Sequence, residues 1–159
     1  MLALGLDPGT ATTGYGLVRL QDDGGLQAVE FGVILTPKDT PAAERLSLLF
    51  HRLNEILVQY RPDVSAVEKL FFQKNVSTAI AVGQARGVLL LALAEAGLDV
   101  AEYTPNEVKQ AVTGYGSADK RQVQEMVRIQ LGLADIPKPD DAADALAIAI
   151  CHLSTRRYV

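Results

Sequence analysis

Apolar residues along the chain fall into short runs closed by turn residues and longer stretches with helical spacing. Short runs rich in Val, Leu and Ile and bounded by Gly, Pro or Asp are typical of buried β-strands. Five such runs predict strands at 2–7, 14–20, 26–36, 63–68 and 98–103. Because only short turns separate the first three, they predict an antiparallel meander at the start of the chain.

Helical spacing of apolar residues predicts five helices after this meander. Their expected ranges are 41–61, 77–96 (with Asn75 as an alternative start), 105–112, 119–131 and 141–154. Thr40 is the expected N-cap of the first helix, and Thr104 to Glu107 form a capping box before the third. This order predicts a single α/β domain over residues 1–159. It has a five-stranded mixed sheet, three strands antiparallel and two parallel, with helices on both faces.

The helix expected at 77–96 is apolar on nearly every side. One apolar face can cover the sheet, but a helix that is apolar all round needs partners on more than one side. Its second face therefore predicts either a subunit interface or a position fully inside the domain.

Composition describes an ordinary globular domain, with 48% hydrophobic and 21% charged residues. The single cysteine excludes a disulfide within the chain, and with only two histidines a zinc site of His and Cys ligands is not expected. The N-terminal segment lacks the basic region of a signal peptide, and the unbroken apolar runs are short for a bilayer span. We therefore expect a cytoplasmic protein that binds no membrane and holds any metal with carboxylates.

Charge is distributed unevenly along the chain, whose net charge is −4. Residues 1–68 carry 5 Lys and Arg against 9 Asp and Glu, whereas residues 69–138 carry 8 against 7. Phosphate binding requires a locally basic surface rather than a basic protein. The distribution therefore permits nucleic-acid binding without requiring it.

The second predicted strand contains two glycines, Gly14 and Gly16. Glycine inside a strand packs no side chain and often marks the close approach of another group. We expect a ligand or another backbone segment to approach the sheet at this point.

Acidic residues stand at the ends of two predicted strands and at the start of the last helix. Asp7 closes the first strand before Pro8–Gly9, and Glu68 closes the fourth. Asp141 and Asp144 are three residues apart, so they share one face of their helix. Each acid also has a purely structural reading, because Asp is common before Pro-Gly turns and acids are common in first helical turns.

The four acids in combination predict a metal site. If the first and fourth strands are parallel neighbours, joined by a right-handed crossover, Asp7 and Glu68 lie at one edge of the sheet. Asp141 and Asp144 can complete a cluster there, while Asp140 is a natural N-cap of their helix. Four carboxylates suit two hard cations, which stand about 3.5–4 Å apart in sites of phosphoryl transfer.

These acids belong to a series of motifs spread over nearly the whole chain. The series is Gly5-Leu6-Asp7-Pro8-Gly9 with Thr13-Gly14-Tyr15-Gly16, Glu68 with Phe71 and Asn75, Gly83-Gln84-Ala85-Arg86-Gly87, Val108-Lys109-Gln110, Gly116-Ser117-Ala118-Asp119-Lys120 and Asp141-Ala142-Ala143-Asp144-Ala145. In this order the motifs resemble the RuvC family of Holliday junction resolvases. The resemblance implies a ribonuclease H-like fold and a metal-dependent crossover junction endodeoxyribonuclease. Such a hydrolase makes symmetric paired nicks in four-way DNA junctions during recombination and repair.

The resemblance implies that the four acids are both the catalytic residues and the metal ligands. Asp7, Glu68, Asp141 and Asp144 match the family's acidic set, which implies Mg²⁺ or Mn²⁺ and two ions per active site. The match leaves Asp140 as a cap.

Five residues are candidates for DNA binding. Lys109 and Lys120 match family lysines that contact DNA phosphates, although the residues alone favour ordinary solvated helix charges. Phe71 matches an aromatic residue that stacks on bases, and Lys74 close to it fits a surface of stacking and charge. Arg86, within a matching motif, completes the set.

The resemblance also implies a homodimer and cooperation with the RuvA–RuvB branch-migration complex. Three alternatives remain: a ribonuclease H-like nuclease acting on RNA, a junction-binding protein without catalysis, and an actin-like ATP-binding lobe. The lobe has a phosphate loop similar to Asp7-Pro8-Gly9-Thr10, but such proteins need two related lobes, more than 159 residues supply. The presence of all four acids disfavours the non-catalytic alternative.

Overall fold

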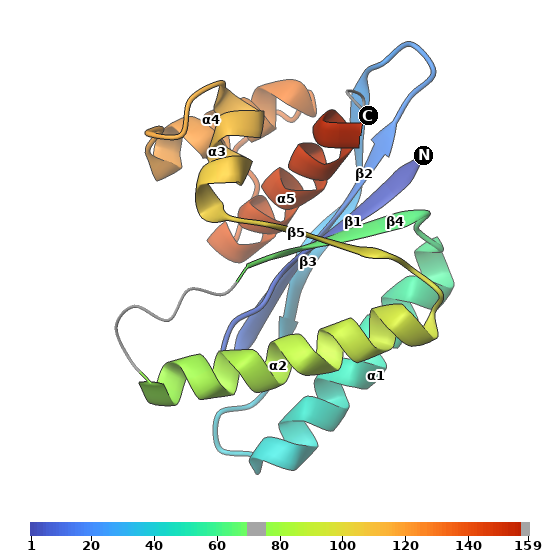
Figure 1. Ribbon diagram of the computed structural model, residues 1–159, viewed down its shortest axis with the longest axis vertical. Coiled ribbons are helices and arrows are strands. Elements are labelled where there is room, and N and C mark those ends of the chain that lie inside the picture. Colours follow the sequence, from blue (N-terminus) through green and yellow to red (C-terminus); the bar gives the residue numbers. More distant parts are fainter. Residues whose placement is uncertain (70–75, 157–159) are drawn as a thin grey trace.

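A five-stranded sheet lies at the centre of the computed structural model, which describes residues 1–69 and 76–156 (Figure 1). Its strands are β1 (Leu2–Asp7), β2 (Thr12–Leu20), β3 (Leu26–Leu35), β4 (Val64–Glu68) and β5 (Val100–Tyr103), in the order β3-β2-β1-β4-β5. β2 is antiparallel to both β1 and β3, whereas β4 is parallel to β1 and β5 is parallel to β4. The predicted mixed sheet is confirmed, including the pairing of the first and fourth strands.

The second strand begins earlier than predicted. It starts at Thr12 instead of Gly14, because Thr12 and Thr13 pair with Leu35 and Ile34 of β3. The connection between β1 and β2 is therefore a tight turn of residues 8–11.

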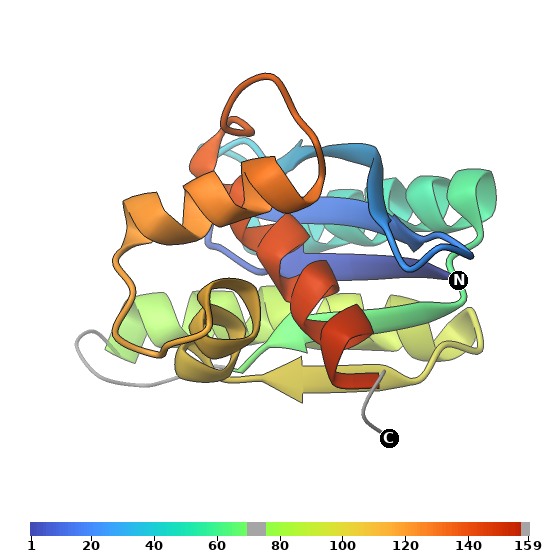
Figure 2. The ribbon, with the colours of Figure 1, turned by 90° about the horizontal axis from the view of Figure 1, so that it is seen from above.

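Helices cover both faces of the sheet, as predicted (Figures 1 and 2). They are α1 (Ala42–Tyr60) and α2 (Val76–Glu95) on one face, and α3 (Pro105–Thr113), α4 (Lys120–Gln130) and α5 (Asp140–Arg156) on the other. Because side chains alternate along a strand, Leu4 of β1 packs toward α1 and α2 while Ala3 packs toward α5. Every residue of α5 from Ala145 to Leu153 is buried, so this helix forms the core of its face.

At the helix N-termini, the structure confirms one predicted cap and contradicts another. Thr104 and Glu107 form the predicted capping box of α3, with Glu107 N donating to Thr104 Oγ1 at 3.1 Å. The prediction that Thr40 caps the first helix is wrong. Pro41 has an extended backbone, with ψ of 144°, so α1 begins at Ala42 and no side chain caps it.

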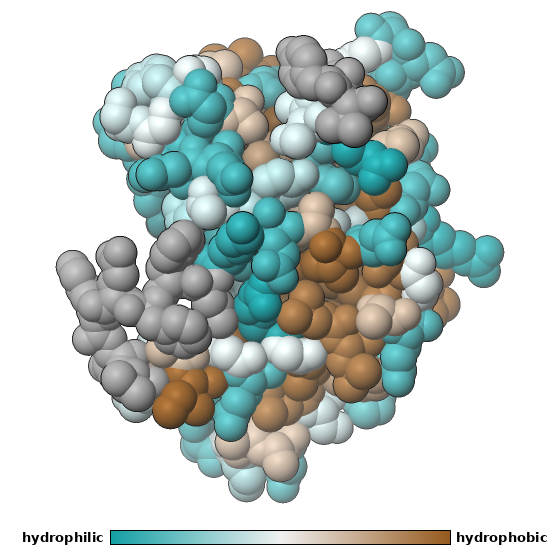
Figure 3. Space-filling model, viewed as in Figure 1, coloured by the Kyte–Doolittle hydropathy of each residue, from teal (hydrophilic) through white to brown (hydrophobic). Residues whose placement is uncertain are grey.

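The long helix α2 has one buried and one exposed side. Leu89 is fully buried against the sheet, whereas Ile80 and Leu91 are 58% and 53% exposed. Figure 3 shows apolar surface gathered over this helix. Ser77–Glu95 is long and apolar enough to cross a bilayer, a test that core helices of non-membrane proteins also pass. Of the two sequence-based alternatives, a position fully inside the domain is wrong.

Candidate active site

Close contact between α5 and the sheet creates the site. Three glycines on β1 and β2 face the start of this helix: Gly5, Gly14 and Gly16. A Cβ atom on Gly14 would overlap with the carbonyl oxygen of Asp141, and one on Gly5 would overlap with that of Ala145. The predicted approach at Gly14 and Gly16 is therefore that of another backbone segment, the first turns of α5.

Three carboxylates meet where β1 ends and α5 begins. Asp7 is the last residue of β1 and pairs with Gly14, while Asp141 and Asp144 lie on the first turns of α5. One oxygen of each carboxylate lies within 4.8 Å of the other two. Over residues 1–69 and 76–156, this is the only group of three or more side chains that could hold a metal ion, and all its donors are oxygens.

Glu68 joins these three carboxylates from the end of β4. Because β1 and β4 are parallel, Asp7 and Glu68 lie at the same edge of the sheet. The carboxyl group of Asp7 interacts with those of both Glu68 and Asp144. The structure thus brings together all four predicted acids, which we name the acid cluster: Asp7, Glu68, Asp141 and Asp144.

Like charges repel strongly within the acid cluster. Burial raises the pKa of Asp7 to about 8, and the negative charges of Glu68, Asp144 and Asp141 act in the same direction. Burial likewise raises the pKa values of Glu68 and Asp144. A bound cation would relieve this repulsion. Carboxylate oxygens suit Mg²⁺ or Mn²⁺, whereas structural Zn²⁺ sites favour sulfur and nitrogen ligands.

Comparison with known proteins identifies the family. A sequence profile described as "Crossover junction endodeoxyribonuclease RuvC" matches residues 3–152. The chain belongs to the RuvC family. The crossover junction endodeoxyribonuclease RuvC of Chloroflexus aggregans is 62% identical over 155 residues, which cover 98% of this chain and 94% of that protein. The resemblance seen in the sequence motifs is confirmed.

Solved structures confirm the ribonuclease H-like fold. RuvC of Thermus thermophilus has a TM-score of 0.93 and 40% identity, covering 99% of this chain and 96% of that one. The T. thermophilus RuvC structure in complex with a Holliday junction substrate has a TM-score of 0.91 and 37% identity, with the same coverage. A yeast mitochondrial Holliday junction resolvase, 13% identical, shares the fold with a TM-score of 0.74 over 98% of this chain and 78% of its own.

Two lysines flank the acid cluster of this RuvC family member. They line a cavity of about 260 Å³ formed by Glu68, Pro105, Val108, Lys109, Lys120, Val123, Asp144, Ala147 and Ile148. Lys120 Nζ lies 3.9 Å from Asp144 Oδ2, and the ammonium group of Lys109 opposes the rise in the pKa of Glu68 that burial causes. Both predicted lysines therefore lie where a phosphate bound beside the acids could meet them.

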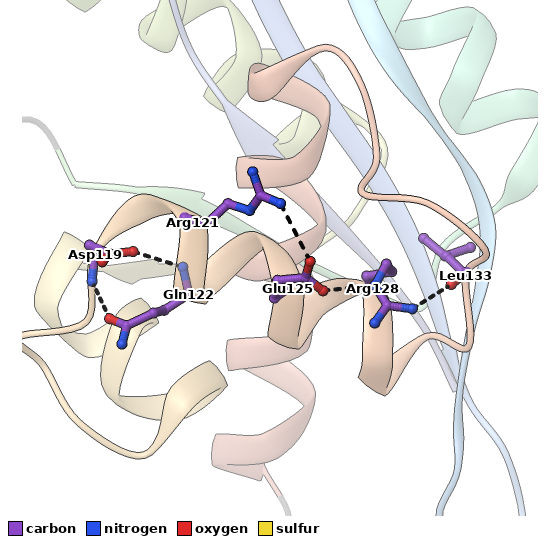
Figure 4. A network of polar contacts seen from close by, with 6 residues as sticks. All are labelled: Asp119, Arg121, Gln122, Glu125, Arg128 and Leu133. Carbon is purple, nitrogen blue, oxygen red and sulfur yellow. Dashed lines mark hydrogen bonds and ion pairs between the residues drawn. The ribbon is translucent and has the colours of Figure 1, made fainter.

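Polar contacts along α4 hold Lys120 at the edge of this cavity. Asp119 and Gln122 form a capping box at the start of the helix, and Gln122 N donates to Asp119 Oδ1 at 2.8 Å (Figure 4). Near the other end, Arg128 Nη1 donates to the carbonyl oxygen of Leu133 at 3.4 Å. Since Lys120 is the first residue of α4, fixing this helix also fixes the base of its side chain.

Asp140 does not have the role predicted for it. The prediction that it caps the last helix is wrong, because α5 begins at Asp140 and the preceding carbonyl oxygen of Pro139 accepts from Ala142 N at 3.0 Å. The carboxylate of Asp140 instead lies 3.1 Å from Lys120 Nζ and accepts from Gln124 Nε2 at 3.2 Å. Capping preference alone gave no sign of this pair, which joins two helices.

Of the remaining DNA-binding candidates, the structure describes only Arg86, which does not lie at the acid cluster. Arg86 on α2 forms an ion pair with Glu102 at 2.6 Å, and its side chain is only 15% exposed. It does not line the cavity between the two lysines. Phe71 and Lys74 lie outside the described residues. DNA contacts by these three residues stay predictions.

Proposed function

We propose that this chain resolves Holliday junctions, making symmetric paired nicks in four-way DNA by metal-dependent phosphodiester hydrolysis. The observation that carries the proposal is the meeting of Asp7, Asp141 and Asp144 within 4.8 Å, with Glu68 beside them, in a member of the RuvC family. The T. thermophilus RuvC complex with a Holliday junction substrate, which has a TM-score of 0.91 to this chain, supports the choice of substrate.

In this proposal the acid cluster holds two Mg²⁺ or Mn²⁺ ions. Two such ions supply activation of the attacking water and stabilisation of the leaving oxygen. Asp7 interacts with both Glu68 and Asp144, and it would hold the ions together with them. Lys109 and Lys120 bind the phosphates that flank the cleaved bond.

The substrate has two equivalent strands to cut, which a two-fold symmetric homodimer with two active sites would match. The exposed apolar side of α2 is the surface that we assign to this dimer. We further propose a cytoplasmic location and cooperation with the RuvA–RuvB complex, and membership of the RuvC family supports both.

Charge-neutral substitution of each acid tests the proposal. Asp7→Asn, Glu68→Gln, Asp141→Asn and Asp144→Asn should each abolish junction cleavage in Mg²⁺ and leave junction binding largely intact, because repulsion from phosphate decreases. Asp140→Asn is the matched control and should keep its activity, since Asp140 contacts Lys120 outside the acid cluster.

Cleavage of junction, duplex and RNA–DNA hybrid substrates is measured on the same proteins. Preference for the hybrid would replace the proposal with an RNA-directed nuclease. A folded Asp140→Asn variant that binds the junction normally but cannot cut it would show that the metal-binding acids have been assigned wrongly.

A further inference from the structure

Side chains from two other elements hold the turn that follows Asp7. Arg45 extends from the first turn of α1, and its Nη2 donates to the carbonyl oxygen of Thr10 at 2.6 Å. Arg45 Nε and Nη2 both donate to Thr36 Oγ1 at 3.3 Å. Thr36, just after β3, donates in turn to the carbonyl oxygen of Ala11, from its amide at 2.9 Å and from its hydroxyl at 3.4 Å.

These contacts form a compact unit beneath the turn. Arg45 is half-buried and borders a small cavity of about 50 Å³ with Gly9 and Thr10. The planar guanidinium fork offers two donors in fixed directions, which the point charge of a lysine cannot reproduce. Thr36 Oγ1 accepts from Arg45 and donates to Ala11, so the hydroxyl links α1 to the turn.

The 8–11 turn directly follows Asp7, whose carboxylate is repelled by the other acids of the acid cluster. β1 ends at Asp7, and pairing with β2 holds the backbone only up to the Asp7–Gly14 pair. Three other acids act on this side chain, so a loose turn would let Asp7 move away from them. The fixed carbonyl oxygens of Thr10 and Ala11 oppose that movement.

We propose that Arg45 and Thr36 are positioning residues that hold the 8–11 turn and thereby place Asp7 for metal binding. This inference rests on the proposed role of Asp7 as a metal ligand. Neither residue touches the reacting atoms, so both act through Asp7.

The contacts of Arg45 and Thr36 with the 8–11 turn are called the clamp here. Two substitutions remove it with little change in the size of the side chain. Arg45→Lys keeps the positive charge and loses the fork, while Thr36→Val keeps the shape and loses the hydroxyl. Each should lower kcat by about 10- to 100-fold, the scale of a small misplacement of a catalytic group, and leave KM for the junction unchanged. Thr36→Ser, which retains the hydroxyl, should stay close to the wild type.

Calorimetric titration with Mg²⁺ in the absence of DNA gives a readout independent of cleavage. Arg45→Lys and Thr36→Val should each weaken Mg²⁺ binding several-fold. The double variant should be little worse than either single variant, because the two residues act as one unit. Arg52→Lys is the control, since Arg52 lies on the same helix and forms an exposed pair with Glu55 at 3.5 Å.

Other outcomes would overturn the clamp. A raised KM with a smaller salt dependence of binding would make Arg45 a direct DNA contact. A lower unfolding temperature with unchanged kcat and Mg²⁺ affinity would make the contacts purely structural. Asp7→Asn, assayed in parallel, separates the two proposals. If Asp7→Asn loses cleavage while the clamp variants are unaffected, only the clamp is overturned. If Asp7→Asn is fully active, the proposed function is overturned.

Discussion

Asp7 is the member of the acid cluster on which the other three acids act most strongly. It ends β1, it is surrounded by three acids, and burial raises its pKa to about 8. At neutral pH the metal-free folded chain therefore keeps a proton on Asp7, which the unfolded chain has lost. A metal ion must displace that proton, so metal binding at this site is coupled to pH.

The first consequence concerns the stability of the metal-free protein. Between about pH 4 and pH 8 the folded state binds more protons than the unfolded state, so the free energy of unfolding should fall as pH rises. The fall is at most about 1.4 kcal/mol per pH unit for each proton by which the states differ. Asp7→Asn should show a weaker dependence and exceed the wild type in stability at pH 8. Urea unfolding in EDTA at pH 5, 6.5 and 8 measures this, and equal slopes for both proteins would contradict it.

Lys109 and Lys120 provide the second prediction at this scale. Both border the cavity beside Glu68 and Asp144, where they are placed to bind phosphate. Lys109→Ala and Lys120→Ala should each weaken junction binding and reduce the slope of log affinity against log salt by about one. Fluorescence anisotropy with labelled junction, using an Asp7→Asn background to prevent cleavage, measures the slope. An unchanged slope with unchanged turnover would mean that both lysines are ordinary surface charges.

Among the elements, α5 combines a structural and a chemical role. Its buried length fills one face of the sheet, and its first turns carry Asp141 and Asp144. The sequence predicted the helix and the shared face of these acids, because both follow from local spacing. Gly14 and Gly16 indicated that a ligand or a backbone segment approaches the sheet, but the sequence could not show that it is α5, because tertiary packing decides which segment crosses the sheet there.

The same reasoning explains the wrong predictions. Thr40 and Asp140 both have residue types that favour N-caps, so local preference pointed to them. The extended backbone of Pro41 and the contact with Lys120 decide these positions instead. The Arg45 clamp was missed because its partners come from three separate segments of the chain.

Close packing of α5 gives a prediction at the scale of the element. Gly14→Ala places a Cβ atom against the carbonyl of Asp141, so α5 must shift and carry its two acids away from Asp7. We expect a loss of about 1–3 kcal/mol in stability, as in other overpacked cores, and loss of cleavage even where the protein is folded. Gly87→Ala is the control for stability alone, because nothing lies within 4 Å of its Cβ position and alanine favours a helix by about 0.5–1 kcal/mol. Wild-type cleavage by Gly14→Ala would contradict this account of the site.

At the scale of the whole molecule, the exposed side of α2 carries the large apolar residues Ile80 and Leu91. The sequence indicated that this helix has two apolar faces but could not assign residues to them. The structure makes the assignment: Leu89 is fully buried, whereas Leu91 is 53% exposed. The two leucines therefore form a matched pair for testing the dimer.

A glutamate at these two positions should have opposite effects. Leu91→Glu should give a folded monomer that is deficient in paired nicking, because it places charge in the proposed interface. Leu89→Glu should instead destabilise the fold by about 3 kcal/mol or more, because it buries an unpaired charge. Sedimentation at micromolar concentration, with circular dichroism, distinguishes these results. A wild-type protein that remains monomeric even on junction DNA would rule out the symmetric mechanism.

The acid cluster takes Asp7 from the first strand and Asp144 from the last helix of the described chain. On the ribosome, Asp7 emerges early, whereas α5 is made only after every strand of the sheet. A nascent polypeptide therefore lacks at least half of the proposed metal ligands until α5 is made. If these acids are the metal ligands, as we propose, cutting activity would arise only once α5 has packed onto the glycines, and the order of translation would keep an unfinished nuclease inactive.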